Sequence, residues 1–574
     1  MVRARSLRIL TSISILAGGL AVFGQTHDAR TIQHLADEYV SLRLQYDPTL
    51  AAGLALPPPE NMHFADRRPE AIRKLEQSED ALLVELKTAG QSNSKDTTYL
   101  VLREELEGRK GLRVCRAELW DLSQTEGWQV EFPGLAANQA VQTPGEKKDA
   151  LQLWHSLPDY LHIDEANLRE GLREGYSVPQ SVVVRVLKQL DGLITDAPED
   201  SPFYAPAKRV NDSSFAGSLR DEIQQRITPA LRKYEEFLRT IYLPQARKSL
   251  GLSALPNGGA CYQAYLRRYT TTDQTPDLVF AHGKDLVASS SDQIRAIGSK
   301  RYGTNDLAES VRRVHDDPHN RFTSEEQLIQ FSREMVERSI GMSRNLFLQL
   351  PSQPVIVRPL PDYQRGTGVS SHYQANPDDR KPATFWISVD DWASRTRGAA
   401  EITAVHETVP GHHLQIATAR RLQPDMKLAG LVFNAAYVEG WANYAERLSE
   451  EQGIDGDDYE RIERRVLAGR SLVIDPGIHA FGWTRPQAEA FAMEAGMSKD
   501  AADDVIDRIA VEPGQLTTYE VGGLAILALR EEARAQLGSG FDLPRFHQQI
   551  LQLGPIPIRS LQEQTRAWIK SQER

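Results

Sequence analysis

The residues with the clearest chemical potential occupy one short stretch, in which three of the chain's 14 histidines fall within eight residues. His406 is followed by Glu407, and Pro410-Gly411 precedes His412 and His413. Imidazole nitrogens and carboxylate oxygens are common zinc ligands, and a glutamate beside a ligand histidine often serves as the base of a zinc hydrolase. The pattern therefore suggests a catalytic metal site, although a kinked helix with incidental histidines would contain the same residues.

The spacing departs from the H-E-x-x-H pattern, in which both histidines lie on one face of a helix. In an unbroken helix, His412 would point about 240° away from His406, and His413 would share its face but lie about 10.5 Å along the axis. Proline removes a helix hydrogen bond and glycine tolerates unusual dihedral angles, so Pro410-Gly411 can break the helix. We therefore predict His406 and His412 as ligands and His413 as their neighbour, with His413 as the alternative second ligand.

A catalytic zinc site needs a third protein ligand and an open position for water. Glu439 and Glu446 are seven residues apart, so they share one face of a predicted helix. Gly440 would let another backbone approach closely. Such a glutamate would ordinarily face solvent, but beside the histidine cluster Glu439 is the best third ligand. Glu446 is predicted to orient a ligand histidine.

Both motifs resemble those of a bacterial family called domain of unknown function 885. The first reads His406-Glu407-x-x-Pro410-Gly411-His412-His413-Leu414-Gln415, and the second reads Glu439-Gly440-Trp441-Ala442-x-Tyr444-Ala445-Glu446. Segments 167–171, 475–483 and 513–519 are also similar to the family, so the resemblance covers most of the chain from about residue 30 onward.

The resemblance implies a largely helical, two-lobed zincin-like metallopeptidase architecture with a deep cleft, similar to the thimet-oligopeptidase and angiotensin-converting-enzyme types. It implies Zn²⁺ on His406, His412 and Glu439, with Glu407 as general base. Tyr519 becomes a candidate donor to the reaction's oxyanion only through this resemblance, because a tyrosine is more commonly part of a core.

Four further residues are candidates for the site. His479 could also donate to the oxyanion, or could merely satisfy a turn at Asp475-Pro476-Gly477. His372 and Tyr373 lie on a loop between two β-like runs and could bind substrate. Arg530 could bind a peptide carboxylate, or could be an ordinary surface arginine.

Apolar residues at helical spacing dominate the chain, whereas residues 355–357 and 383–389 are β-like. The predicted fold class is therefore mainly α with a small β element. We expect one helical metallopeptidase-like region over residues 25–574, with a possible lobe boundary near the Pro- and Asp-containing segment 197–210.

Residues 1–24 have the pattern of a secretory signal peptide, because three arginines precede an apolar run that ends in small residues. An uncleaved membrane anchor is the alternative. No cysteine follows the run, so a lipoprotein anchor is not expected. We predict export to the periplasm or the extracellular space, with no stable membrane insertion after the signal is removed.

Removing residues 1–24 would take away three positive charges and no negative one, so the formal net charge would change from −11 to −14. This charge disfavours nucleic acid and anionic membranes as partners. A peptide or small amide substrate is the expected partner, and the sequence does not indicate the oligomeric state. In an exported protein, Cys115 and Cys261 could form a disulfide, or they could remain two buried thiols.

Three classes of function compete. An exported zinc metallopeptidase is favoured, in which a zinc-bound water is deprotonated by Glu407 and the proton passes to the leaving amine. The alternatives are a zinc hydrolase of a non-peptide amide or ester, and a non-catalytic helical binding protein. The sequence does not distinguish endopeptidase from exopeptidase action.

Overall fold

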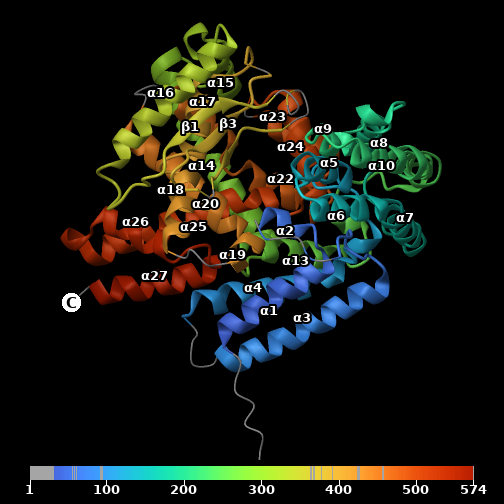
Figure 1. Cartoon of the computed structure of the whole chain (residues 1–574). Coiled ribbons are helices and arrows are strands. Elements are labelled where there is room, and N and C mark those ends of the chain that lie inside the picture. Colours follow the sequence, from blue (N-terminus) through green and yellow to red (C-terminus); the bar gives the residue numbers. More distant parts are fainter. Residues whose placement is uncertain are drawn as a thin grey trace, which may run out of the picture.

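The computed structural model describes residues 31–572, apart from 55, 57–58, 60, 91–94, 362–364, 366–368, 377, 391, 423–426, 455–457 and 495. The predicted signal peptide lies outside these residues. Helices dominate the described chain, and its named strands form a single sheet of three (Figure 1). The predicted class, mainly α with a small β element, is therefore confirmed. None of the described helices combines the length and the apolar character needed to cross a membrane.

Two large cores organise the helices. The first lies mainly among helices of the first half of the chain: α5 (Trp128–Asn138), α6 (Pro144–His155), α7 (Leu157–Glu174), α8 (Gln180–Leu193), α10 (Ser213–Glu222), α11 (Thr228–Phe237) and α13 (Gly258–Thr270). The second joins the two ends of the described chain, through α1 (Ile32–Tyr46), α3 (Pro69–Ala89), α4 (Thr97–Leu112), α20 (Ala435–Gln452), α25 (Thr518–Leu537), α26 (Leu543–Gln552) and α27 (Ile558–Gln572). Accordingly, the N-terminal helices α1, α3 and α4 and the C-terminal helix α27 lie on the same, lower side of the molecule in Figure 1.

Segment 197–210 lies inside the first core rather than between two cores. It forms the short helices η4 (Pro198–Asp200), η5 (Pro202–Tyr204) and α9 (Ala205–Lys208). Phe203 and Tyr204 are buried in the same cluster as residues that precede and follow them in the chain. The segment is therefore packed into one core with the helices on both sides of it, and the packing shows no boundary between lobes there.

Cys115 and Cys261 form a disulfide that joins the end of η2 (Arg113–Cys115) to α13 across 146 residues of sequence. Of the two alternatives that the sequence left open, the structure has the disulfide.

The small sheet has the order β1-β3-β2, with β1 (Val355–Pro359) parallel to β3 (Ala383–Ile387) and β2 (His372–Gln374) antiparallel to it. Alternate residues of β3 are buried, and they pack in a cluster with α16 (Glu325–Ser343) and α17 (Arg397–Glu407). Both predicted β-like runs are therefore strands. Among the described residues, β2 pairs with β3 alone, so its other edge has no strand partner there.

Two helices that carry site residues cross at unusually close range. A β-carbon on Gly440 of α20 would overlap the backbone of Gly522 of α25, and one on Gly522 would overlap the carbonyl oxygen of Ala436. Glycine is therefore required at this crossing because it has no side chain. The close approach brings the helix that carries Glu439 next to the helix that carries Tyr519.

Candidate metal centre

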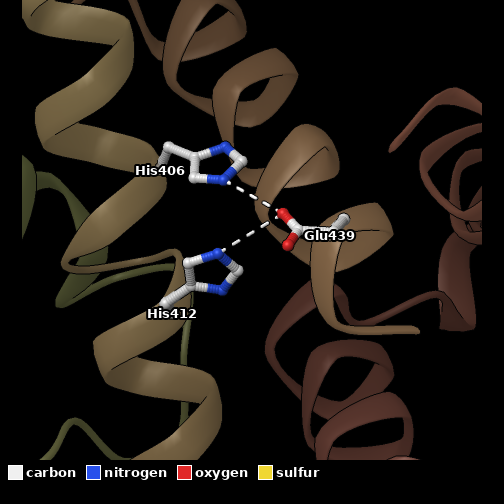
Figure 2. Close-up of side chains that lie close together, drawn as sticks. All are labelled: His406, His412 and Glu439. Carbon is white, nitrogen blue, oxygen red and sulfur yellow. Dashed lines mark ion pairs between the residues drawn. The ribbon is translucent and has the colours of Figure 1, made fainter. Parts of the chain in front are cut away.

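The structure brings the three predicted ligands together. Nε2 of His406 lies 3.4 Å from Oε2 of Glu439, and Nε2 of His412 lies 3.6 Å from the same oxygen (Figure 2). One ligand atom from each residue lies within 4.8 Å of the other two. The two imidazole rings are nearly perpendicular, with centroids 4.7 Å apart. This arrangement presents two nitrogens and one carboxylate oxygen to a common point.

A break between two helices produces this convergence. Helix α17 ends at Glu407, and α18 (His412–Leu422) begins at the second ligand, so Pro410-Gly411 interrupts the helix as predicted. The Val409–Pro410 peptide bond is cis. The carbonyl oxygen of Pro410 accepts a 2.8 Å hydrogen bond from Nε1 of Trp441. The motif that begins at Glu439 therefore holds the Pro410-Gly411 break in position.

Gly411 cannot be replaced without movement of the backbone, because a β-carbon there would overlap the carbonyl oxygen of His406. We expect Gly411→Ala to lower the free energy of unfolding by about 1–3 kcal/mol, the usual cost of overpacking. It should also weaken zinc binding, since the ligands on both sides of the break would shift. Denaturant unfolding and zinc titration would measure both effects.

Gly192→Ala is the matched control, because a β-carbon on this exposed residue of α8 would meet nothing within 4 Å. The control should be neutral or stabilise the helix by about 0.5–1 kcal/mol. Equal stability and equal zinc affinity of the two variants would contradict the assigned role of Gly411.

The electrostatics of the cluster favour a positive charge among the three ligands. Burial alone raises the pKa of Glu439, but hydrogen bonds and charge from His406 and His412 outweigh it and hold the pKa well below its usual range. For His406, burial lowers the pKa, yet the carboxylates of Glu439 and Glu446 raise it well above the ordinary value. A carboxylate that stays ionised between two imidazoles is equally suited to a divalent cation. The residues therefore fit a zinc ion in donor type, number and charge.

Glu446 fixes the orientation of His406. Its Oε1 lies 2.8 Å from Nδ1 of the imidazole. If that nitrogen donates to the carboxylate, Nε2 carries the lone pair that faces Glu439, which is the tautomer a metal ligand requires. The predicted supporting role of Glu446 therefore agrees with its position. Nδ1 of His412, in contrast, is buried and has no hydrogen-bond partner in the described part of the chain.

We expect Glu446→Gln to reduce zinc affinity by about 10–100-fold, the usual effect of losing the outer hydrogen-bond partner of a metal ligand. Competition with a chromophoric chelator would measure the change. Glu451→Gln on the same helix is the control, because that carboxylate binds Arg530 instead. If the two variants bind zinc equally well, Glu446 does not support the site.

Glu407 is the last residue of α17 and directly follows the predicted ligand His406. It is buried, with 8% of its surface exposed. Its Oε2 accepts a 2.8 Å hydrogen bond from the backbone amide of Tyr373, at the open edge of β2. The sequence suggested that Tyr373 could bind substrate, and this role stays a prediction. In the structure, its backbone amide positions the candidate base. This contact joins residues 34 positions apart, and no sequence motif indicated it.

His413 points away from the ligands. Its Nε2 lies 2.9 Å from the carbonyl oxygen of Gln353, and its Nδ1 lies 3.1 Å from the hydroxyl of Tyr373. Both ring nitrogens of His413 are therefore occupied, so His412 is the better candidate for the second ligand. Burial lowers the pKa of His413 and raises that of Tyr373 to about 12, so both groups remain neutral at pH 7.

Tyr519 lies at the site, in the first turn of α25, where its ring stacks on His406 with centroids 6.0 Å apart. Burial and the carboxylate of Glu439 raise the pKa of the phenol, and Arg508 opposes them only in part, so the hydroxyl keeps its proton. Asp475 positions the turn that precedes this helix, because its carboxylate accepts hydrogen bonds from the amide of Gly514.

The structure contradicts the predicted roles of His479 and Arg530. His479 is fully buried, with Nδ1 accepting from the amide of Leu252 and Nε2 donating to the carbonyl oxygen of Ile509, so no substrate can reach it. It ends α22 (Arg470–His479), and the predicted turn at Asp475 is part of that helix. Arg530 is buried rather than on the surface, and it binds both oxygens of Glu451 at 2.7 and 2.8 Å.

His372 lies in β2 next to Tyr373, partly exposed, with Nδ1 2.9 Å from the carbonyl oxygen of Ser370. Ser370 and Ser371 line the site's cavity, and the side chain of His372 does not. Its role in substrate binding therefore stays a prediction.

A cavity of about 490 Å³ opens on one side of the candidate centre. His406, Glu407 and Tyr519 form part of its wall. The wall also contains several residues that the sequence did not single out, among them Arg470 and Arg508. An arginine on a helix usually faces solvent, so neither residue carried a signal that could have been recognised without the fold.

Comparisons with known proteins agree with this architecture. Residues 48–565 match the family described as bacterial protein of unknown function, DUF885. A protein from Colwellia psychrerythraea, described as a putative lipoprotein, has a similar crystal structure with a TM-score of 0.83, 21% identity, and coverage of 94% of this chain and 99% of its own. A putative lipoprotein of unknown function from Shewanella oneidensis has a TM-score of 0.75, 19% identity, and coverage of 93% and 99%. No curated protein matches the sequence. Because the family match spans most of its length, the chain belongs to the DUF885 family of bacterial proteins.

Proposed function

We propose that this protein is an exported zinc-dependent hydrolase, and specifically a metallopeptidase with a zincin-like site between helical lobes. The observation that carries the proposal is the convergence of His406, His412 and Glu439 on one point, with Glu407 beside them at the wall of a cavity. Two imidazoles, one carboxylate and a neighbouring glutamate are the donor set and base of many catalytic zinc sites.

A bound zinc ion would supply Lewis acidity, which polarises a carbonyl group and lowers the pKa of water toward ~7. Glu407 accepts a proton from the attacking water on Oε1, since Oε2 is held by the amide of Tyr373. It later gives that proton to the leaving amine. The phenol of Tyr519, which stays protonated, donates a hydrogen bond to the oxyanion that develops on the substrate.

The open edge of β2 favours a peptide over other amides or esters. This edge faces Glu407, because the backbone amide of Tyr373 points away from β3 and toward the carboxylate. An extended peptide can add to an exposed strand edge through main-chain hydrogen bonds. Such pairing would place a scissile peptide bond near the base. A compact ester or amide substrate has no extended main chain to pair with this edge.

Export is supported by the sequence and by the disulfide. Residues 1–24 have the pattern of a signal peptide. The Cys115–Cys261 bridge is typical of proteins that fold outside the reducing cytosol. The two solved structures named above are described as putative lipoproteins, a class of exported protein, which agrees with this location.

Digestion of a mixed peptide library by the purified protein, with and without a metal chelator, tests the proposal. We expect peptide cleavage that the chelator abolishes and added zinc restores, in protein that carries one zinc ion per chain. Hydrolysis of amino-acid esters or amides without peptide cleavage would instead indicate a different hydrolase. Metal-free protein with no hydrolytic activity would indicate a binding protein.

A further inference from the structure

Arg470 is a buried cation in the wall of the site's cavity. It begins α22 and is only 4% exposed. Its Nε donates to the carbonyl oxygen of Val466 at 3.0 Å, its Nη1 donates to that of Phe491 at 2.7 Å, and the guanidinium lies 5.1 Å from the Phe491 ring. Among the described residues, it forms no ion pair with a carboxylate, and its Nη2 makes no hydrogen bond.

A buried charge without a counter-ion is costly, and the pKa of Arg470 reflects this cost. Burial lowers the pKa, and the more distant carboxylate of Glu494 reverses the shift only in part. Buried charges in proteins are usually paired or bind an ion. Arg470 therefore has unused capacity for an anion that comes from outside the chain.

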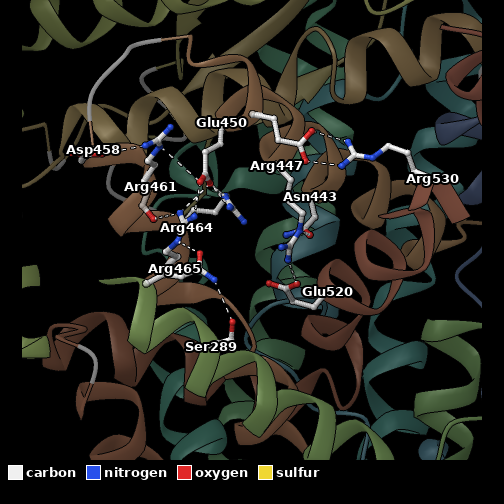
Figure 3. Close-up of polar contacts among 12 residues, drawn as sticks. Ser289, Asn443, Arg447, Glu450, Asp458, Arg461, Arg464, Arg465, Glu520 and Arg530 are labelled. Atoms are coloured by element: carbon white, nitrogen blue, oxygen red, sulfur yellow. Dashed lines mark hydrogen bonds and ion pairs between the residues drawn. The ribbon is translucent and has the colours of Figure 1, made fainter. Parts of the chain in front are cut away.

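Other charged groups of the cavity wall already have partners within the protein. Arg464 of the wall shares the carboxylate of Glu450 with the neighbouring Arg465 of α21 (Figure 3). Arg508 donates from Nε to Oε2 of Glu512 at 3.0 Å.

The acidic groups of the same wall are engaged as well. Glu446 holds His406, and Glu520 binds Arg447, which is also drawn in Figure 3. Glu407, the third carboxylate of the wall, accepts a hydrogen bond from the amide of Tyr373. Among the described residues, none of the three carboxylates forms an ion pair with Arg470. An anion in the cavity would therefore meet one uncompensated guanidinium.

We propose that Arg470 binds the terminal carboxylate of the peptide substrate, so that the protein is an exopeptidase acting near the C-terminus. The inference rests on the proposed peptidase function. It adds the direction in which the peptide binds and the terminus near which it is cut. A planar guanidinium matches a carboxylate in shape and charge, and such charge-assisted hydrogen bonds are the stronger ones in proteins.

The size of the cavity sets how far from the terminus the protein cuts. Its volume of about 490 Å³ is within the range of sites for small ligands. The wall that holds Arg470 also holds His406 and Glu407, so the carboxylate and the scissile bond occupy one cavity. Only a short terminal piece fits between them, and longer peptides must extend out of the site on the other side.

Binding can be measured apart from turnover in the zinc-loaded Glu407→Gln protein. The probes are N-acetyl-trialanine with a free carboxylate and the same peptide as its C-terminal amide, titrated by calorimetry. We expect the acid to bind about 10–100-fold more tightly than the amide, the ratio for a hydrogen-bonded charge. Equal affinity for the two probes, or no binding of either, would overturn the proposal. This test does not require a substitution of Arg470.

The Arg470→Gln exchange in the same background should abolish the preference for the acid while zinc content stays unchanged. The melting temperature should fall moderately, because the carbonyl oxygens of Val466 and Phe491 lose buried hydrogen bonds. Arg461→Gln is the matched control, because that arginine lies on the neighbouring α21 (Tyr459–Leu467), pairs with Asp458 and does not line the cavity. It should keep the full preference. A preference that persists in Arg470→Gln would contradict the assignment.

A digest by the unmodified protein separates this inference from the proposed function. Free-acid peptides should be cut within a few residues of the C-terminus. For the corresponding C-terminal amides, kcat/KM should be lower by about tenfold or more, because KM is higher. Equal cleavage of acids and amides would overturn the exopeptidase inference and leave the peptidase proposal standing. Absence of any cleavage would overturn the peptidase proposal itself.

Discussion

Glu407→Gln is expected to reduce peptide hydrolysis by about 10²–10⁴-fold, the usual contribution of a general base, while zinc remains bound. Glutamine is nearly isosteric, and its side-chain oxygen can still accept the hydrogen bond from the Tyr373 amide. The amide cannot take a proton from water at neutral pH, so the loss should fall on kcat. Steady-state kinetics and metal analysis of the same preparation would measure both quantities.

Glu337→Gln on α16 is a suitable control, since this glutamate is exposed and does not line the cavity. It should have the activity and the zinc content of the unmodified protein. An active Glu407→Gln protein would contradict the role of this residue as base. A variant that lost both zinc and activity would show instead that Glu407 helps to hold the metal.

His412→Ala is expected to lose zinc and all measurable hydrolysis. A site with three protein ligands keeps few metal contacts when one is removed, so the loss should exceed the ~10–100-fold effect of an outer partner such as Glu446. Zinc content after dialysis against a weak chelator should fall from one ion per chain to nearly none. Glu439→Ala should have the same effect, because its Oε2 faces both imidazoles.

His413→Ala is the matched control, because the neighbouring histidine binds the Gln353 carbonyl and the Tyr373 hydroxyl rather than the cluster. It should retain zinc and lose some stability, since two buried hydrogen bonds disappear. If His413→Ala loses zinc while His412→Ala keeps it, the assignment of the second ligand is wrong.

The sequence was sufficient to predict that His406, His412 and Glu439 converge, because the information was local. His406 and His412 are six residues apart, so on one continuous helix their side chains would point in different directions. Pro410-Gly411 breaks the helix and allows both side chains to face one point. Glu439 and Glu446 lie seven residues apart, which places them on one helix face. The helical class and the two β-like runs were likewise visible as periodicity along the chain.

The remainder depends on contacts between distant segments, which a single sequence does not reveal. The amide that holds Glu407 comes from β2, and the cavity wall that contains Arg470 is assembled from several helices. His479 and Arg530 were wrongly placed at the site because a histidine or an arginine on a helix has the same local pattern in a core as in a cleft. Only tertiary packing distinguishes the two environments.

The account depends most on a single zinc ion held by His406, His412 and Glu439. Anomalous diffraction at the zinc edge, from crystals of the purified protein grown without added metal, tests this claim most directly. The expected result is one strong peak about 2.0–2.2 Å from Nε2 of each histidine and from a carboxylate oxygen of Glu439. A crystal without a peak at this point, or with the metal bound at His413 instead, would contradict it.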